Sequence, residues 1–340
     1  MLINYKLTLL ITCLSFSILG RSVYRIKKSK LPSLTAYLNK NKEEKYCRSD
    51  SHWLYKPLFK TFNERYFFKH LLPNNYIPSL KNPFPTSTQE LKDQIEGLLL
   101  EVKAKKKKYT NFTLLQNKDF NPAYGNGLLI LKFNDYPYVL KLFIETPKSF
   151  ICPWNKGREQ IFLFYLGGGI NRHLSGLTRI KNLYAVRKKI KKHKLWKNRI
   201  VTPNKWHWIP KNPEWIHLKG VDIGPLKKAS TRIPATYGII ADYIENNGSF
   251  SLSNNLHRKI ALKLCNDLNM IIDPHITNFF IDKKNKQIAI VDTEHFPTIV
   301  GIKENVKFNN YIEWYLYLAG KCLKDLYFRT KVERLELQKN

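Results

Sequence analysis

The sequence predicts an α+β fold in which a small antiparallel sheet precedes a mostly helical region. Short apolar or alternating runs follow one another between residues 113 and 144, and turn-forming clusters separate them. Segments with helical periodicity lie on both sides of these runs. The chain has 340 residues, 43% of them hydrophobic, which is enough for a sizeable core.

The composition indicates the charge of the partners that this chain would attract. A net charge of +32 favours anionic partners such as phosphates, acidic lipid surfaces or nucleic acid. An AT-rich genome would raise the lysine content equally well. The cysteines form no C-x-x-C pair and have no histidine at zinc-ligand spacing, which argues against a disulfide scaffold and a metal site built on them. They are Cys13, Cys47, Cys152, Cys265 and Cys322.

The N-terminal residues 1–20 contain an apolar run from Leu7 to Gly20 that suits a signal peptide or a short membrane anchor. The basic flank that follows favours a cytosolic location for the downstream chain, and it suits a short anchor whose basic juxtamembrane segment lies on anionic lipid. We therefore expect a membrane-associated or exported protein. Residues 21–108 form a basic extension that contains a predicted helix over residues 87–108.

Residues 109–245 begin with the predicted strands "TLLQ", "GLLILKF" and "YVLKLFI". Gly125 and Gly127 form a G-x-G at the first turn, which fits a plain hairpin as well as a phosphate-binding loop. Lys141 lies inside the third strand, where its charge faces either solvent or a specific anion. Glu159 comes before the apolar run "QIFLFYL", and a carboxylate there also suits the first turn of a helix.

A long middle segment separates this sheet from the next strand, which ends at Asp242. The segment contains the basic run from Arg187 to Arg199, interleaved with Trp196. Such a run fits an exposed helix face, or nucleic acid bound through phosphates and base stacking.

Residues 246–340 begin with a polar turn and a helix over residues 253–270, capped by Ser253 or Asn254. Asp273 and Asn278 then form D-x-x-x-x-N. The strands "FFID" and "IAIV" follow as a hairpin, and Asp292 lies at the end of the second strand. Oxygen-rich side chains that meet at one sheet edge suit a hard cation such as Mg²⁺.

In this order of elements the sequence resembles the protein-kinase-like superfamily, above all its small-molecule and lipopolysaccharide or aminoglycoside kinase branches. The resemblance covers about residues 111–326 and implies ATP and Mg²⁺ as cofactors. It implies a two-lobed, protein-kinase-like fold, with an N-lobe and a long insert over residues 109–245 and a reduced, mostly helical C-lobe over residues 246–340. It implies that Gly125 and Gly127 cover the phosphates, that Lys141 binds them and pairs with Glu159, and that Asp242 begins the hinge.

The same resemblance assigns the remaining positions. Asp273 would orient or deprotonate the acceptor hydroxyl, while Asn278 and Asp292 would hold Mg²⁺. The chain departs from the pattern at Ile271, where protein kinases have histidine, and at Thr293 and Glu294, which follow Asp292. Only 48 residues follow Asp292, so a small or lipid-linked acceptor is expected rather than a docked protein.

Three hypotheses of function follow from the sequence. The first is an ATP- and Mg²⁺-dependent phosphotransferase acting on a hydroxyl group, with its catalytic part in a compartment that contains ATP. The second is a kinase-like module that binds without catalysis. The third is a basic membrane-surface or nucleic-acid binder that uses Lys103 to Lys108 and Arg187 to Arg199, and its binding would fall steeply with salt.

Overall fold

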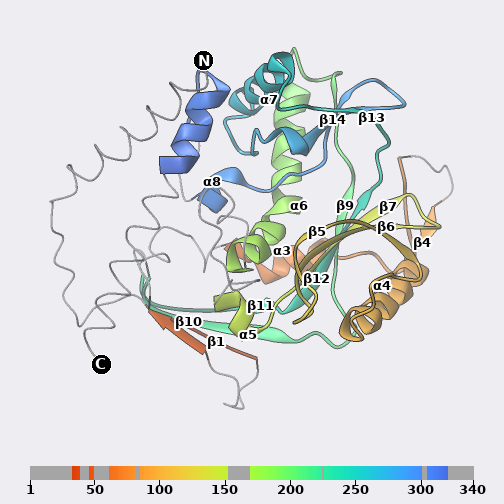
Figure 1. The fold of residues 1–340 in the computed structure, drawn as a ribbon, viewed down its shortest axis with the longest axis vertical. Coiled ribbons are helices and arrows are strands. Elements are labelled where there is room, and N and C mark those ends of the chain that lie inside the picture. Colours follow the sequence, from red (N-terminus) through yellow and green to blue (C-terminus); the bar gives the residue numbers. More distant parts are fainter. Residues whose placement is uncertain are drawn as a thin grey trace. The chain divides into compact units, whose positions relative to one another are not determined.

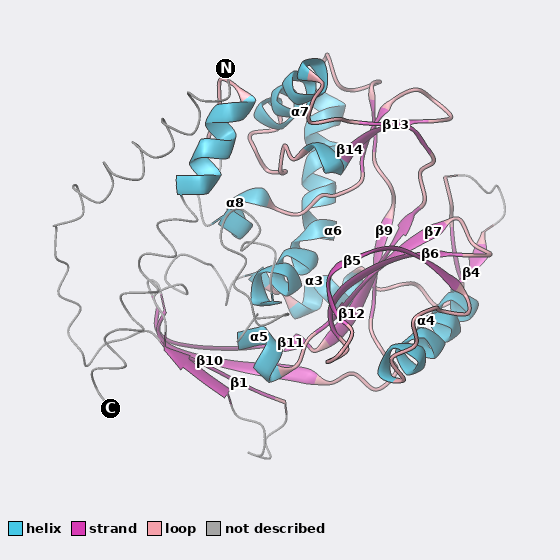
Figure 2. Cartoon of the chain, viewed as in Figure 1, coloured by secondary structure: helices cyan, strands magenta, loops and turns pink. Residues whose placement is uncertain are grey.

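The computed structural model describes residues 33–38, 46–49, 61–80, 85–151, 169–223, 226–300 and 305–320 (Figures 1 and 2). The chain divides into the units Met1–Leu31 and Pro32–Asn340, and every described residue belongs to the second. The fold is α+β with mainly antiparallel sheets, as predicted. The apolar run from Leu7 to Gly20 lies outside the described residues. Within the described part, no helix combines the length and the apolarity that a membrane span requires.

The central element is a five-stranded sheet with the order β5-β6-β7-β12-β9, in which all neighbouring strands are antiparallel. Its strands are β5 (Phe112–Asn121), β6 (Asn126–Phe133), β7 (Tyr138–Ile144), β9 (Lys205–Trp208) and β12 (Thr236–Asp242). The three predicted strands are therefore confirmed as β5, β6 and β7. The strand that ends at Asp242 is confirmed as β12, and it lies beside β7.

One face of this sheet packs against α4 (Thr88–Lys103) and is called the α4 face. Successive side chains of a strand point to opposite faces, so alternate residues of β6 and β7 reach the helix. The contact is formed by Leu91, Ile95 and Leu98 of the helix and by Leu129, Leu131, Leu140 and Leu142 of the sheet. All are buried. The predicted helix over residues 87–108 is thus confirmed in its main part, and it ends before the lysine run.

The opposite face, called the pocket face, carries the alternate residues Leu128, Ile130, Val139, Lys141 and Ile239. The long helix α6 (Gly169–Lys192) lies on this side, whereas α4 lies on the other (Figure 1). Gly176 permits the close approach, because a Cβ atom there would lie 2.0 Å from the Tyr237 hydroxyl oxygen. Leu174 and Leu177 of α6 belong to the core on the sheet side, and Val186 to the core of the helical region.

The helical region contains α7 (Asn255–Asp267), α8 (Phe296–Val300) and a helix over residues 311–320. Its small sheet has the order β13-β14-β15-β8. The strands are β8 (Ile200–Val201), β13 (Asn246–Ser249), β14 (Phe279–Asp282) and β15 (Ile288–Ile290). Asn254 caps α7 by accepting hydrogen bonds from the N–H groups of Leu256 and His257. The predicted helix and the hairpin of "FFID" and "IAIV" are both confirmed.

A second four-stranded sheet joins distant parts of the chain in the order β11-β10-β1-β2. Its strands are β1 (Ser33–Tyr37), β2 (Tyr46–Ser49), β10 (Trp215–Ile223) and β11 (Leu226–Pro234). Smaller elements are α3 (Glu64–Lys69), β3 (Tyr76–Ile77), β4 (Thr86–Ser87) and α5 (Pro147–Ile151). This sheet leaves no local signal in the sequence, because its β1–β10 pairing joins strands that are far apart in the chain.

The basic run from Arg187 to Arg199 forms the last part of α6 and the turn that follows it. Lys188, Lys191 and Lys194 are exposed, as expected for a solvated helix face. Trp196 is buried, and its indole N–H donates to Asp267 Oδ2 at 2.8 Å. The base stacking considered for Trp196 is therefore wrong for this conformation, since the ring is part of the core.

Candidate active site

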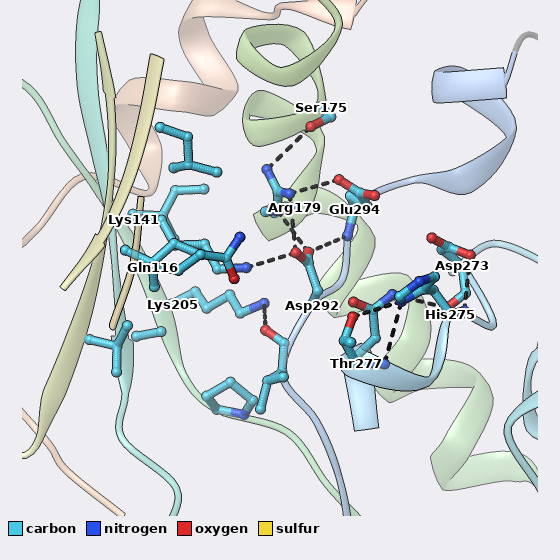
Figure 3. A pocket seen from close by; sticks show the side chains of 18 of the residues that line it. Gln116, Lys141, Ser175, Arg179, Lys205, Asp273, His275, Thr277, Asp292 and Glu294 are labelled. Atoms are coloured by element: carbon cyan, nitrogen blue, oxygen red, sulfur yellow. Dashed lines mark hydrogen bonds and ion pairs between the residues drawn. The ribbon is translucent and has the colours of Figure 1, made fainter. Parts of the chain in front are cut away.

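A pocket of about 770 Å³ opens between the pocket face of the sheet, α6 and the segment from Asp273 to Phe296. Figure 3 shows charged side chains entering it from the sheet, from α6 and from the segment after β15. Of the residues predicted from sequence, five line this pocket: Lys141, Asp242, Asp273, Asn278 and Asp292. The fold thus brings together side chains from β7, from the end of β12 and from both sides of the β14–β15 hairpin.

Lys141 reaches the pocket because it alternates with Leu140 and Leu142, which face α4. Its Nζ atom donates to Asp292 Oδ2 at 2.7 Å. Burial lowers the pKa of Lys141, and the charge of Asp292 opposes that shift. The sequence left open whether this charge faces solvent or an anion, and the structure gives it a carboxylate partner.

Asp292 follows β15 and accepts hydrogen bonds on both oxygens. Arg179 Nε donates to Oδ1 at 2.7 Å, and Arg179 Nη2 donates to Oδ2 at 3.1 Å. The backbone N–H of Glu294 also donates to Oδ1, at 3.1 Å. Burial favours the neutral acid, but the positive charges of Arg179 and Lys141 prevail and hold the pKa of Asp292 well below its usual range. Asp292 is therefore an ionised carboxylate between two cations (Figure 3).

Arg179 is a site residue that the sequence analysis missed. Its Nη2 atom also donates to Glu294 Oε2 at 2.7 Å, so a single guanidinium joins two carboxylates. Its neighbours on the same helix face are Ser175 and Asn182, and Asn182 donates to the carbonyl oxygens of Ile271 and Thr293. The signal in the sequence that could have found Arg179 is the helical spacing of Ser175, Arg179 and Asn182, which puts three polar residues on one face of a largely buried part of the helix.

Lys205 on β9 was missed as well. Its Nζ atom donates to Thr293 Oγ1 at 2.8 Å and to the Val291 carbonyl oxygen at 3.1 Å. Burial lowers its pKa well below the usual value. The signal was the alternation Lys205, Trp206, His207, Trp208, which places the lysine on the pocket face and the two tryptophans on the other.

Asp273 and Asn278 lie in the turn that ends in the 3₁₀ segment η6 (Ile276–Asn278). Asp273 Oδ1 accepts from the backbone N–H of His275 at 3.0 Å. Asn278 Nδ2 donates to the Asp273 carbonyl oxygen at 3.1 Å, which leaves the amide oxygen as its end for binding a cation or a donor. Burial, reinforced by the charge of Glu294, raises the pKa of Asp273 to about 8.

The predicted glycines lie away from the pocket, whereas Asp242 lines it. Gly125 lies in the β5–β6 turn and Gly127 is the second residue of β6; both have positive φ, and neither is among the described residues that line the pocket. Asp242 lines the pocket at the end of β12, while its Oδ2 accepts from the backbone N–H of Asn204 at 2.8 Å. Burial raises the pKa of Asp242 to about 6. Glu159 lies outside the described residues, so its predicted pairing with Lys141 stays a prediction.

The donor atoms in the pocket are of the kind that Mg²⁺ prefers, because Asn278, Asp292 and Glu294 all offer oxygen. Among the described residues, however, no three His, Cys, Asp or Glu side chains are grouped as a metal cage. Mg²⁺ usually binds through one or two carboxylates together with substrate phosphates, rather than in an all-protein cage. These residues fit that second mode of binding.

Comparison with protein-family models, curated proteins and solved structures found no significant match for this chain. Its function is therefore inferred from the residues that line the pocket and from their charges.

Proposed function

We propose that the chain is an ATP- and Mg²⁺-dependent phosphotransferase with a protein-kinase-like, two-lobed fold, acting on a hydroxyl of a small or lipid-linked acceptor. One observation carries the proposal. Lys141 Nζ lies 2.7 Å from Asp292 Oδ2, although 151 positions separate the two residues in the chain. A strand lysine and a strand-end aspartate that meet in one pocket are what phosphoryl transfer of this kind requires.

The order of the other parts supports the same function. Lys141 lies on the third strand of the five-stranded sheet, after a glycine-containing hairpin. Asp242 ends β12, which pairs with the strand of Lys141, and D-x-x-x-x-N precedes the β14–β15 hairpin that Asp292 follows. In protein kinases the phosphate-binding lysine, the catalytic-loop Asp and Asn, and the metal-binding Asp occur in this order.

The pocket residues can divide the chemistry among them. Lys141 would leave its contact with Asp292 and bind phosphate oxygens instead. Asn278 and Asp292 would hold Mg²⁺, which when bound neutralises charge on the phosphate oxygens. Asp273 lies on the far side of Asp292 from Lys141 (Figure 3). With its pKa raised to about 8, its ionised form is a stronger base than an ordinary carboxylate and can accept the proton of an acceptor hydroxyl.

A second candidate is a nucleotide-binding module that does not transfer phosphate. The observation that favours it is the charge balance at Asp292, whose two oxygens both accept hydrogen bonds from cations. Such a module would bind a nucleotide with little dependence on Mg²⁺ and would show no turnover.

Calorimetry of ATP binding to the full chain, with and without Mg²⁺, tests the proposal. We expect Mg²⁺ to strengthen ATP binding to the wild type, and Asp292→Asn to abolish that gain. Asp273→Asn is the matched variant: it should still bind MgATP, while the slow hydrolysis of ATP falls by about 10²-fold or more because the general base is lost. If the folded wild type binds no ATP, the enzyme proposal fails. Binding that ignores both Mg²⁺ and Asp292→Asn would favour the binding module.

A further inference from the structure

The helix α6 contributes a positive charge, Arg179, to its contact with the segment after β15, where protein kinases have a helix glutamate. In protein kinases a helix glutamate pairs with the strand lysine and leaves the metal-binding aspartate to the metal. Here α6 contains no acidic residue over Gly169–Lys192, and the charged residue that it presents to the pocket, among those described, is Arg179. The guanidinium binds Asp292 and Glu294, and Lys141 in turn binds Asp292 (Figure 3).

The charges around Asp292 disfavour a further cation at this position. Arg179 and Lys141 place two positive charges against the carboxylates of Asp292 and Glu294 at contact distances of 2.7 Å, so this cluster has no excess of negative charge. In such a balanced cluster a divalent ion gains little attraction, and it is repelled by the two cations within a few ångströms. Lys205 adds a third basic side chain behind Thr293.

The two cations differ in how easily they can leave. The Arg179 side chain is 5% exposed, makes two hydrogen bonds to Asp292 and one to Glu294, and stacks its guanidinium 5.5 Å from the Phe143 ring centroid. The Lys141 side chain is 14% exposed, and Asp292 is its one ion-pair partner among the described residues. Lys141 is therefore the partner that a phosphate group can withdraw, because a bidentate guanidinium contact is the stronger and more rigid of the two.

We propose that Arg179 is a positioning residue and an internal counter-ion, which fixes Asp292 and Glu294 and keeps a divalent cation out until nucleotide phosphates withdraw Lys141. The metal then enters with the nucleotide rather than before it. This inference rests on the proposed function, since it concerns the metal of that same site. It differs from a purely structural role because it requires Arg179 to oppose metal binding in the free protein.

The test measures Mn²⁺ binding to the full chain without nucleotide, by the loss of the free Mn²⁺ signal in electron paramagnetic resonance. We expect the wild type to bind Mn²⁺ weakly and Arg179→Met to bind it at least about tenfold more tightly, because one positive charge has left the carboxylate pair. Arg179→Lys keeps the charge and should bind as weakly as the wild type. Lys188→Met is the matched control, since it removes an exposed cation from the same helix away from the pocket.

A second substitution locates the gain. In Arg179→Met/Asp292→Asn the tighter binding should disappear, and Mn²⁺ should raise the melting temperature of Arg179→Met alone. If Arg179→Met does not fold, Arg179→Gln takes its place, because its neutral amide can still donate a hydrogen bond. The inference is overturned if wild type and neutral variants bind Mn²⁺ equally, tightly or not at all. Because no nucleotide is used, this outcome is independent of whether the chain binds ATP.

Discussion

The two faces of the five-stranded sheet are built from alternate residues of the same strands, yet only the pocket face adds charged side chains to its apolar ones. The α4 face is closed by leucines and isoleucines from α4, β6 and β7. The pocket face carries Lys141, which donates to Asp292, and Lys205, which donates to Thr293. Arg179 of α6 donates to the same Asp292. The comparison shows that a strand can supply a dry core and a charged site at once, because its side-chain period is two.

The largest loss of stability is expected when the ion pairs on the pocket face are removed. Asp292→Ala removes the carboxylate shared by Arg179 and Lys141, and leaves buried cations partly unpaired. We expect the free energy of unfolding to fall by about 3–5 kcal/mol, measured by urea denaturation. Asp292→Asn keeps the shape and a hydrogen-bond acceptor, so its loss should be smaller. Equal stability of wild type and Asp292→Ala would show that the ion cluster is solvated and carries no net constraint.

The next largest loss of stability is expected from a substitution on the α4 face. Ile95 on α4 is fully buried, and Ile95→Ala should lower the free energy of unfolding by about 3 kcal/mol through lost burial and a residual cavity. The matched control is Leu100→Ala on the same helix, where the side chain is 67% exposed and the loss should be within about 0.5 kcal/mol. Both variants should bind ATP as the wild type does. A change in ATP affinity in Ile95→Ala would mean that the two faces are coupled.

A pH-dependent effect is expected at His207, which lies two residues after Lys205 on β9 and on the same face of the sheet. Burial lowers the pKa of His207 to about 3, well below the ordinary 6.5 of an unfolded chain. The unfolded state therefore binds more protons below about pH 6.5, and stability falls as the pH is lowered. By linkage the loss from this residue is about 3 kcal/mol between pH 7 and pH 4. His207→Phe should flatten that part of the stability profile in urea titrations at each pH, and an unchanged profile would contradict the assignment.

The smallest effects separate Gly125 in the β5–β6 turn from Gly127 at the start of β6. At Gly127 (φ 112°) an added Cβ would lie 2.2 Å from the Asp119 carbonyl oxygen, so Gly127→Ala should cost about 2 kcal/mol. Gly125 (φ 63°) has open space around it, and Gly125→Ala should cost only about 1 kcal/mol. Both costs would be measured by thermal unfolding. If Gly125→Ala also weakens ATP binding about tenfold, the turn contacts phosphates in the bound state.

Local patterns were sufficient for much of the fold. The strands β5, β6 and β7, the helices α4 and α7 and the β14–β15 hairpin follow from apolar periodicity, turn residues and capping. The β1–β10 pairing could not be predicted in this way, because it joins residues near 35 with residues near 219 and leaves no local signal. The position of Arg179 was missed for a related reason, since a helix arginine resembles any surface cation until its carboxylate partners are known.

The sequence by itself determined that Lys141 would face away from Leu140 and Leu142, and that Asp273, Asn278 and Asp292 would lie around one hairpin. Alternation and turn chemistry are properties of short segments, so they are readable without a fold. Only the tertiary structure decided which cation meets which carboxylate. Arg179 and Asp292 are 113 positions apart, and the guanidinium finds its partner because α6 packs against the sheet and the helical region at once.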